Sequence, residues 1–171
     1  TEMPERFDRL VIMNTFLPTG EIPAGEAFLR WRAFAEKLGT KLNVGQLVNM
    51  TMLNGDLPPE VIAAYDAPFP EDHYKAGAAI FPLLIPLTSE DPVAAEMKAA
   101  QERLRTWQKP AFVLFAEADP ILGRGGVYFR RLIPTAREQP KINIEGAGHF
   151  LQEEKGEEIA QHILDFLERT S

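Results

Sequence analysis

The sequence contains no cysteine among its 171 residues. It therefore has no disulfide framework, no thiolate nucleophile and no thiolate metal site. Serine is almost as scarce, since only Ser89 and Ser171 occur. Ser89 suits the N-cap of a helix and Ser171 is the last residue, so neither is a convincing nucleophile. The absence of cysteine fits both reducing and oxidising compartments.

Long apolar runs and an excess of basic residues are also missing. No apolar run reaches the length of a membrane-spanning helix, and residues 1–6 do not resemble a signal peptide. Lys and Arg number 18 against 25 Asp and Glu, which gives a formal charge of −7. Such a surface does not favour nucleic acid or anionic membranes. We therefore expect no nucleic-acid or membrane partner and a cytoplasmic location, although the first residue is not Met and need not be the translation start.

The residues that are present predict a mixed fold. Short continuous apolar runs at 9–14, 110–116 and 141–145 are typical of strands buried on both faces. Residues 127–133 predict a short helix, and residues 153–169 place apolar side chains on one face of a C-terminal helix. Strands and helices that alternate at this spacing predict parallel strands joined by crossovers.

The stretch between the first two runs has a different pattern, with helical segments separated by proline and glycine. The predicted helices are 26–38, 44–53, 59–65, 72–80 and 91–107, the last with Ser89 as its N-cap. An all-helical insertion between buried strands is typical of a lid over an active site. We therefore divide the chain into a core strand (1–14), a helical cap with its return helix (15–107) and the C-terminal part of the core (108–171).

Three parallel strands make a poor independent sheet. Parallel strands need both faces covered, and their edges are seldom left open. The run at 9–14 comes first and has no earlier strand to pair with. Either a partner supplies the rest of the sheet, or the chain is part of a longer protein.

The strongest signal for chemistry is the segment 145–150, Glu-Gly-Ala-Gly-His-Phe. It places His149 on a tight glycine loop just after a predicted strand, where open α/β sheets hold their sites. The alternative is a surface loop histidine without a task. Two further histidines, His73 and His162, are scattered on predicted helices and do not indicate a metal site with His149.

An acid candidate follows the second predicted strand. Asp119 comes just after that strand, so its carboxylate can accept a hydrogen bond from an imidazole and stabilise its charged form. The order acid, then histidine, is that of α/β-hydrolases. Glu117 is the rival acid, and Asp-Pro as turn chemistry is the alternative interpretation. The chain has no Gly-x-Ser-x-Gly or Gly-x-Asp-x-Gly segment, so a nucleophile is missing.

Seven segments together carry a family resemblance. They are 9–15, 26–31, 65–70, 74–77, 81–82, 118–121 and 146–153. Over essentially its whole length the sequence resembles the C-terminal half of haloalkane dehalogenases of the α/β-hydrolase superfamily. The Asp-Ala-Pro-Phe-Pro segment at 66–70 with a lid tryptophan is the more specific part. Asn14 stands where some members carry their catalytic acid, which indicates the subgroup whose acid follows the next strand.

The resemblance implies the C-terminal part of an α/β-hydrolase sheet, about three parallel strands with helices, carrying an all-helical cap. It also implies an Asp nucleophile that displaces halide and forms an alkyl–enzyme ester. His149 then activates the water that hydrolyses the ester, while Asp119 holds the imidazole. Trp31 is implied as a halide-binding residue, since its indole N–H only donates. The implied substrate-pocket positions, for which core packing is the alternative, are Phe28, Phe81, Pro82, Ile85, Ile121 and Leu122.

The sequence departs from the family because it lacks the part that holds the nucleophile and the second halide donor. The expected function is therefore half of a haloalkane dehalogenase, inactive alone and completed by an N-terminal half. Its expected ligands are a small haloalkane, water and halide, with no cofactor and no metal. One alternative is an epoxide hydrolase, for which Tyr65 and Tyr74 are available but lie in segments shared with dehalogenases. Another is a non-catalytic fragment or binding module.

Overall fold

The computed structural model of the chain describes residues 2–171 and divides into two compact units. The sheet unit contains the chain up to Leu17 together with Glu96–Ser171. The helical unit is Pro18–Ala95. This division groups the helix before the second strand with the sheet, whereas the division expected from the sequence groups that helix with the cap.

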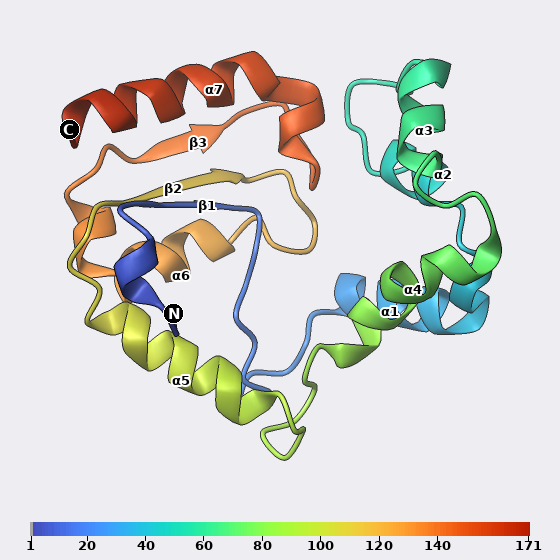
Figure 1. Cartoon of the computed structure of the whole chain (residues 1–171), viewed down its shortest axis with the longest axis horizontal. Coiled ribbons are helices and arrows are strands. Elements are labelled where there is room, and N and C mark those ends of the chain that lie inside the picture. The colour runs from blue at the N-terminus through green and yellow to red at the C-terminus, as the bar shows by residue number, and fades with distance from the viewer. Residues whose placement is uncertain (1) are drawn as a thin grey trace. The chain divides into compact units, whose positions relative to one another are not determined.

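The sheet unit is built on strands β1 (Leu10–Met13), β2 (Ala111–Ala116) and β3 (Ile142–Ile144), which run parallel in the order β1-β2-β3 (Figure 1). Leu10 lies opposite Ala111, and Leu114 lies opposite Ile142. The expected fold class is confirmed, because parallel strands with helices form at the apolar runs. Within residues 2–171, no further strand pairs with the outer edge of β1.

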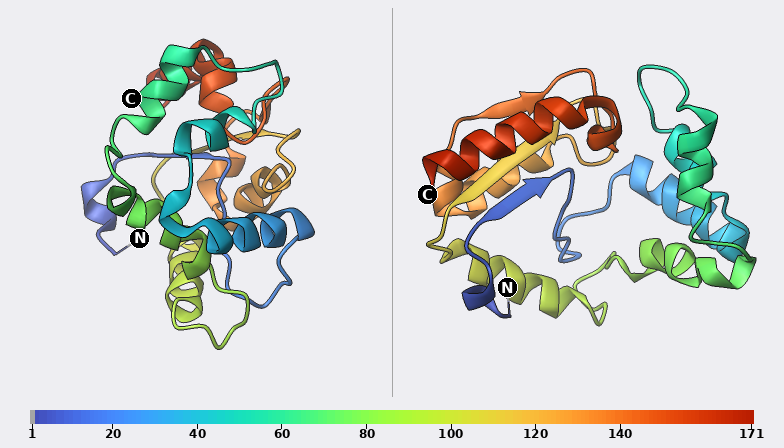
Figure 2. Two further views of the ribbon diagram at one scale, coloured as in Figure 1. Left: turned by 90° about the vertical axis from the view of Figure 1, so that its right-hand side faces the viewer. Right: turned by 45° about the horizontal axis from the view of Figure 1, so that its top comes forward.

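Helices cover both faces of this sheet. They are α5 (Ala94–Arg105), α6 (Gly125–Leu132) and α7 (Leu151–Arg169). All six residues of β2 are buried, and their side chains alternate between two clusters. Val113 and Phe115 pack against α5 and α6, while Phe112 and Leu114 pack against α7, which lies in front of the sheet in the right panel of Figure 2. Burying one large apolar side chain contributes about 1.5–3 kcal/mol to the free energy of unfolding. Because β2 contributes buried side chains to both clusters, it is the centre of the unit.

The helical unit contains α1 (Glu26–Leu38), α2 (Val44–Asn49), α3 (Pro59–Asp66) and α4 (Ala76–Leu84). Helix α1 packs against α4, and α2 packs against α3. The 3₁₀ turns of the chain are Pro4–Arg6, Gly39–Lys41, Asp72–Lys75 and Pro134–Arg137. None of the helices in residues 2–171 combines the length and apolar character needed to cross a bilayer.

Several helix ends differ from the prediction, and at two of them the structure shows local hydrogen bonds that accompany the difference. Helix α2 ends at Asn49 instead of Leu53. The Asn49 side chain donates to the Asp56 carboxylate and accepts from the N–H of Leu57, so the residues that follow are bonded to the helix end as a loop. Helix α5 begins at Ala94 and is not capped by Ser89. The carboxylate of Asp91 instead accepts hydrogen bonds from the preceding backbone, which forms a turn before the helix starts.

Candidate active site

Asp119 is held by the backbone of the loop that follows β2. Its N–H donates to the carbonyl of Ala116 at 3.2 Å, and its Oδ1 accepts from the N–H of Ile121 at 2.8 Å. Gly123 allows the loop to close tightly, since a Cβ at that position would lie 2.6 Å from the Glu117 carbonyl oxygen. The side chain of Asp119 is fully buried, so its second oxygen has a fixed direction.

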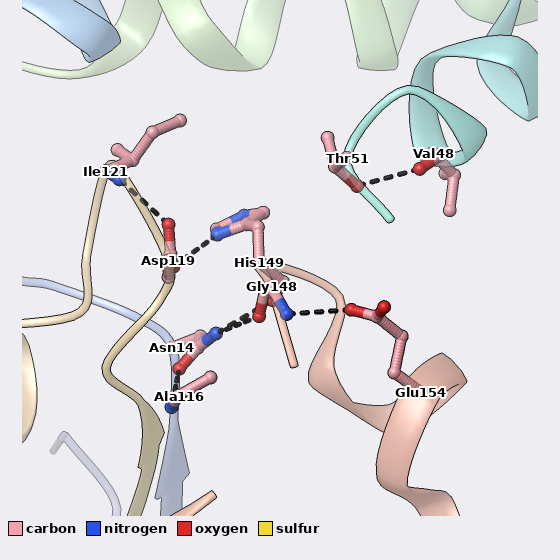
Figure 3. A network of polar contacts seen from close by, with 9 residues as sticks. All are labelled: Asn14, Val48, Thr51, Ala116, Asp119, Ile121, Gly148, His149 and Glu154. Carbon is pink, nitrogen blue, oxygen red and sulfur yellow. Dashed lines mark hydrogen bonds and ion pairs between the residues drawn. The ribbon is translucent and has the colours of Figure 1, made fainter. Parts of the chain in front are cut away.

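His149 lies on the loop between β3 and α7, at the carboxyl end of the sheet. Gly146 takes a φ of 65°, a conformation that favours glycine, and lets the chain turn there. The His149 Nδ1 lies 2.8 Å from the Asp119 Oδ2. Figure 3 shows the two side chains pointing toward one another. The histidine side chain remains 30% exposed. The sheet thus brings together the two residues that the sequence predicts as acid and base, with the imidazole accessible and the carboxylate buried behind it.

The environment of Asp119 keeps it ionised at neutral pH. Burial alone raises the pKa of Asp119, but the hydrogen bonds from His149, Ile121 and Leu122 outweigh burial and hold that pKa below its ordinary value. A buried carboxylate in contact with Nδ1 keeps the proton on that nitrogen and stabilises the imidazolium when it forms. The arrangement can therefore support a neutral His149 as a general base through its other ring nitrogen.

The rival acid lies elsewhere. Glu117 is exposed, and its carboxylate accepts a hydrogen bond from the Asn143 side chain on β3. Glu117 lies two residues closer to the end of β2 than Asp119, and its side chain contacts the neighbouring strand β3. The carboxylate that contacts the imidazole is that of Asp119.

Two polar residues that bind the backbone around His149 were not predicted as site residues. Asn14 is buried at the end of β1 and donates from its amide to the carbonyls of Gly148 and His149. Glu154, in the first turn of α7, accepts from the N–H of Gly148 at 2.7 Å. The available signal was a polar residue directly after a buried strand, but a sequence does not reveal hydrogen bonds between segments 134 residues apart.

The halide and pocket candidates are distributed over both units. Phe28 and Trp31 lie on α1, Phe81 and Pro82 lie in α4, and Ile85 is the residue after α4. The Trp31 side chain is half-buried, with its ring 6.1 Å from that of Phe34. Phe81 is 68% exposed, whereas Pro82 is buried. The remaining two, Ile121 and Leu122, follow Asp119 in the sheet unit. Their roles in a pocket remain predictions.

One guanidinium connects the two helices of the helical unit that carry these candidates. Arg32, next to Trp31 on α1, donates from Nη1 to the carbonyls of Pro82 and Ile85, each at 2.9 Å. These carbonyls lie in the last turn of α4 and at the residue that follows it, where backbone acceptors have no helical partner. Arg32 therefore joins α1 to the end of α4.

The other histidines have local partners. His73 lies 3.4 Å from the Glu71 carboxylate, and His162 lies 3.9 Å from that of Glu158. Across residues 2–171, no group of three or more His, Asp or Glu side chains has the arrangement of a metal site.

Similar proteins of known sequence place these observations in a family. No protein-family model matches the chain. A haloalkane dehalogenase of Psychrobacter cryohalolentis is 39% identical over 166 residues, which cover 97% of this chain and 54% of that protein. One from Mycobacterium marinum is 43% identical over 158 residues, covering 92% and 52%. The chain therefore spans about half the length of the curated relatives that it matches.

Solved structures agree with the sequence comparison. A haloalkane dehalogenase from Paraglaciecola agarilytica has a TM-score of 0.81 and 34% identity, with 94% of this chain and 52% of that one covered. A second, from Agrobacterium tumefaciens, has a TM-score of 0.78 at 20% identity, with 99% and 61% covered, and supports the fold alone.

The parallel strands and their helices, with an acid after β2 and a histidine after β3, define the C-terminal half of an α/β-hydrolase. The resemblance expected from the sequence is confirmed. Within that class, the chain is homologous to haloalkane dehalogenases over nearly all of its length and corresponds to the C-terminal half of such a protein.

Proposed function

We propose that this chain supplies the acid, the base and one halide donor of a haloalkane dehalogenase whose nucleophile lies in an N-terminal part. The observation that carries the proposal is the 2.8 Å contact between Asp119 and His149 in a chain homologous to dehalogenases. The ligands would be a small haloalkane, water and the released halide. The partner would be an N-terminal half that pairs with the open edge of β1.

The proposed reaction has two steps. A carboxylate oxygen of the N-terminal part attacks the carbon that bears the halogen, a C–O bond forms, and the halide leaves with the electron pair. This step needs no base, because a carboxylate is already ionised at neutral pH. Water then attacks the ester carbonyl and gives one proton to His149. The bond between the carbonyl carbon and the alkoxy oxygen breaks, the imidazolium returns that proton to the departing alcohol oxygen, and the carboxylate is restored as the second proton of water passes to solvent. Asp119 stabilises the imidazolium during this second step.

In this proposal the helical unit provides the environment for the leaving halide. The indole N–H of Trp31 would donate to the charge that develops on the halogen, and a pocket poor in water strengthens such an interaction. The apolar candidates Phe28, Phe81, Pro82, Ile85, Ile121 and Leu122 would exclude water around the alkyl chain.

The first test is completion of the chain. Alone, it should not release bromide from a short bromoalkane, and its open sheet should make it aggregate or lack a sharp melting transition. When joined to the missing N-terminal portion, taken from a full-length relative such as the Psychrobacter cryohalolentis protein, it should fold cooperatively and release bromide. Ion chromatography and calorimetry measure the two properties.

The same preparation separates the alternatives. Turnover of an epoxide without bromide release would favour an epoxide hydrolase. A cooperatively folding chain that is inert when completed would favour a binding module. Glu117→Gln serves as the control variant, because it removes an exposed carboxylate of the same loop and should leave bromide release unchanged.

A second prediction concerns Trp31. In the completed protein, Trp31→Phe should weaken bromide binding by about one charge-assisted hydrogen bond, roughly 1.5–3 kcal/mol, or about 10- to 150-fold. Bromide titration followed by tryptophan fluorescence quenching or calorimetry measures this change. Trp107→Phe is the matched control: Trp107 is buried in the sheet unit, and its indole N–H has no hydrogen-bond acceptor within the described residues. Equal bromide affinity in wild type and Trp31→Phe would mean that Trp31 does not donate to the halide and serves only in packing.

A further inference from the structure

We propose that Asn14 is a positioning residue, which fixes the backbone of the His149 loop so that the imidazole stays against Asp119. The kinetic consequence of this inference rests on the proposed function, whereas its structural consequence does not. Asn14 comes directly after β1, the strand that contributes neither the acid nor the base.

The Asn14 amide uses both its donor group and its acceptor. Its Nδ2 donates to the carbonyl oxygens of Gly148 and His149, each at 3.0 Å. Its Oδ1 accepts from the N–H of Ala116, the last residue of β2, also at 3.0 Å (Figure 3). A short amide side chain offers two donors and an acceptor together. Asn14 thus joins the end of β2 to the His149 loop.

The backbone of Asn14 departs from ordinary geometry to make these bonds. Its φ is 26°, and among residues 2–171 it is the one non-glycine residue with a positive φ. Asparagine tolerates this region better than most residues do. Such conformations persist where surrounding contacts hold them, and they gather at functional sites. Here the contacts that hold it are the three hydrogen bonds to β2 and the His149 loop.

The same loop is also held by α7. The Glu154 carboxylate accepts from the Gly148 N–H, so both the N–H and the carbonyl of Gly148 are bound by side chains. The backbone of His149 is bound by Asn14, and its ring by Asp119. Removing the Asn14 donors leaves two carbonyls without these partners, so the loop must move toward water to satisfy them. The imidazole moves with that loop.

The alternative is that Asn14 is purely structural and acts only through its hydrogen bond with Ala116, which connects the ends of β1 and β2. Asn14→Asp separates the two roles because the carboxylate keeps the acceptor for the Ala116 N–H. It loses both donors and places negative charge against the carbonyls of Gly148 and His149. Asn14→Gly removes every bond but suits the positive φ. The control is Thr135→Val, which removes a hydrogen bond from a buried side chain to the Lys109 carbonyl in the same unit.

The experiment uses the completed protein and two measurements. The first is the NMR signal of the proton shared by His149 Nδ1 and Asp119, assigned by its loss in His149→Gln. It should broaden or disappear in both Asn14 variants and persist in Thr135→Val. The second is single-turnover kinetics at neutral pH. Ester hydrolysis should slow by about 10- to 100-fold in both variants, the size expected for a misplaced group, while the halide burst and bromide affinity stay at wild-type values.

Other outcomes overturn the inference. If Asn14→Asp retains the proton signal and the hydrolysis rate while Asn14→Gly loses them, the bond to Ala116 is what matters, and Asn14 is structural. An equal loss in Thr135→Val leads to the same conclusion. Should the buried charge of Asn14→Asp prevent folding, Asn14→Gly and Thr135→Val are compared for both the proton signal and the unfolding free energy. Loss of the proton signal in Asn14→Gly alone supports positioning, and its loss in both variants or in neither overturns the inference. A wild-type protein that releases no halide would refute the proposed function, and the proton signal would still test the position of His149.

Discussion

His149→Gln should trap the completed enzyme as its alkyl ester. The first step, attack of a carboxylate on the haloalkane, needs no base, so one equivalent of bromide should be released at close to the wild-type rate. The second step needs a base to take the proton from water, and a positioned base contributes on the order of 10²- to 10⁴-fold. Hydrolysis should therefore slow by that amount, and the alkylated protein should accumulate.

Rapid-mixing measurement of bromide, together with intact-mass spectrometry, tests this expectation. The mass should increase by the alkyl group of the bromoalkane and return slowly to its starting value. Glu117→Gln, treated identically, should show no lasting adduct, because its carboxylate contacts Asn143 instead of the imidazole. If His149→Gln folds but loses the bromide burst as well, the histidine acts on the nucleophile itself. The mechanism of a serine hydrolase would then replace that of a dehalogenase.

The sheet could be predicted from the sequence because its signals are local. The run 110–116 is apolar at almost every position, and the structure buries all six residues of β2 on two faces. The ends of β2 and β3 could also be predicted, and parallel strands bring their carboxyl ends to one edge of a sheet. Asp119 and His149 meet there for that reason, 30 residues apart in the chain.

Other parts of the site depend on contacts that the sequence does not display. Asn14 binds the loop of His149 across 134 to 135 residues, and its positive φ and three partners are known only after folding. At the end of α2, the Asn49 side chain bonds to Asp56 and to the N–H of Leu57, and a periodicity of apolar residues does not show such bonds. The sequence-based signals therefore predict the strands and the pair Asp119 and His149, and the structure adds the polar residues that hold this pair in place.

Glu154 illustrates the same limit at shorter range. It lies beside a departure from helical geometry inside α7, where Lys155 has φ −137° and ψ 32°. The first turn of α7 is therefore set apart from the rest of the helix, and its Glu154 reaches back to Gly148. The amphipathic pattern of 153–169 predicts the helix but not this break, because the pattern reports which face is buried and not the local φ and ψ.

Asp119→Asn should slow the same step as His149→Gln, but to a smaller extent. The asparagine keeps the shape of the side chain and an oxygen to accept from the Ile121 N–H. Its amide then faces Nδ1 as a donor, which moves the imidazole proton to the other nitrogen and removes the base from the water. Ester hydrolysis should fall by about 10²-fold, the lower end of the range for a lost base, with the bromide burst unchanged, in the single-turnover assay. A lost burst with the fold intact would contradict this role.

The same variant has a second effect, on stability against acid. Burial raises the pKa of Asp119, but hydrogen bonds from His149 and the loop outweigh burial and leave that pKa lowered in the folded protein. A lowered carboxyl pKa contributes stability that is fully present above the ordinary value of 3.8 and is lost as the pH falls through the lowered value. Because the amide introduced by Asp119→Asn cannot titrate, the excess unfolding free energy of the wild type over this variant should be greatest near neutral pH and shrink on acidification. Urea unfolding of the completed proteins across that range measures the difference, with Glu117→Gln as the control. A difference that is constant with pH would mean that the contact between Asp119 and His149 does not hold the carboxylate in its charged form.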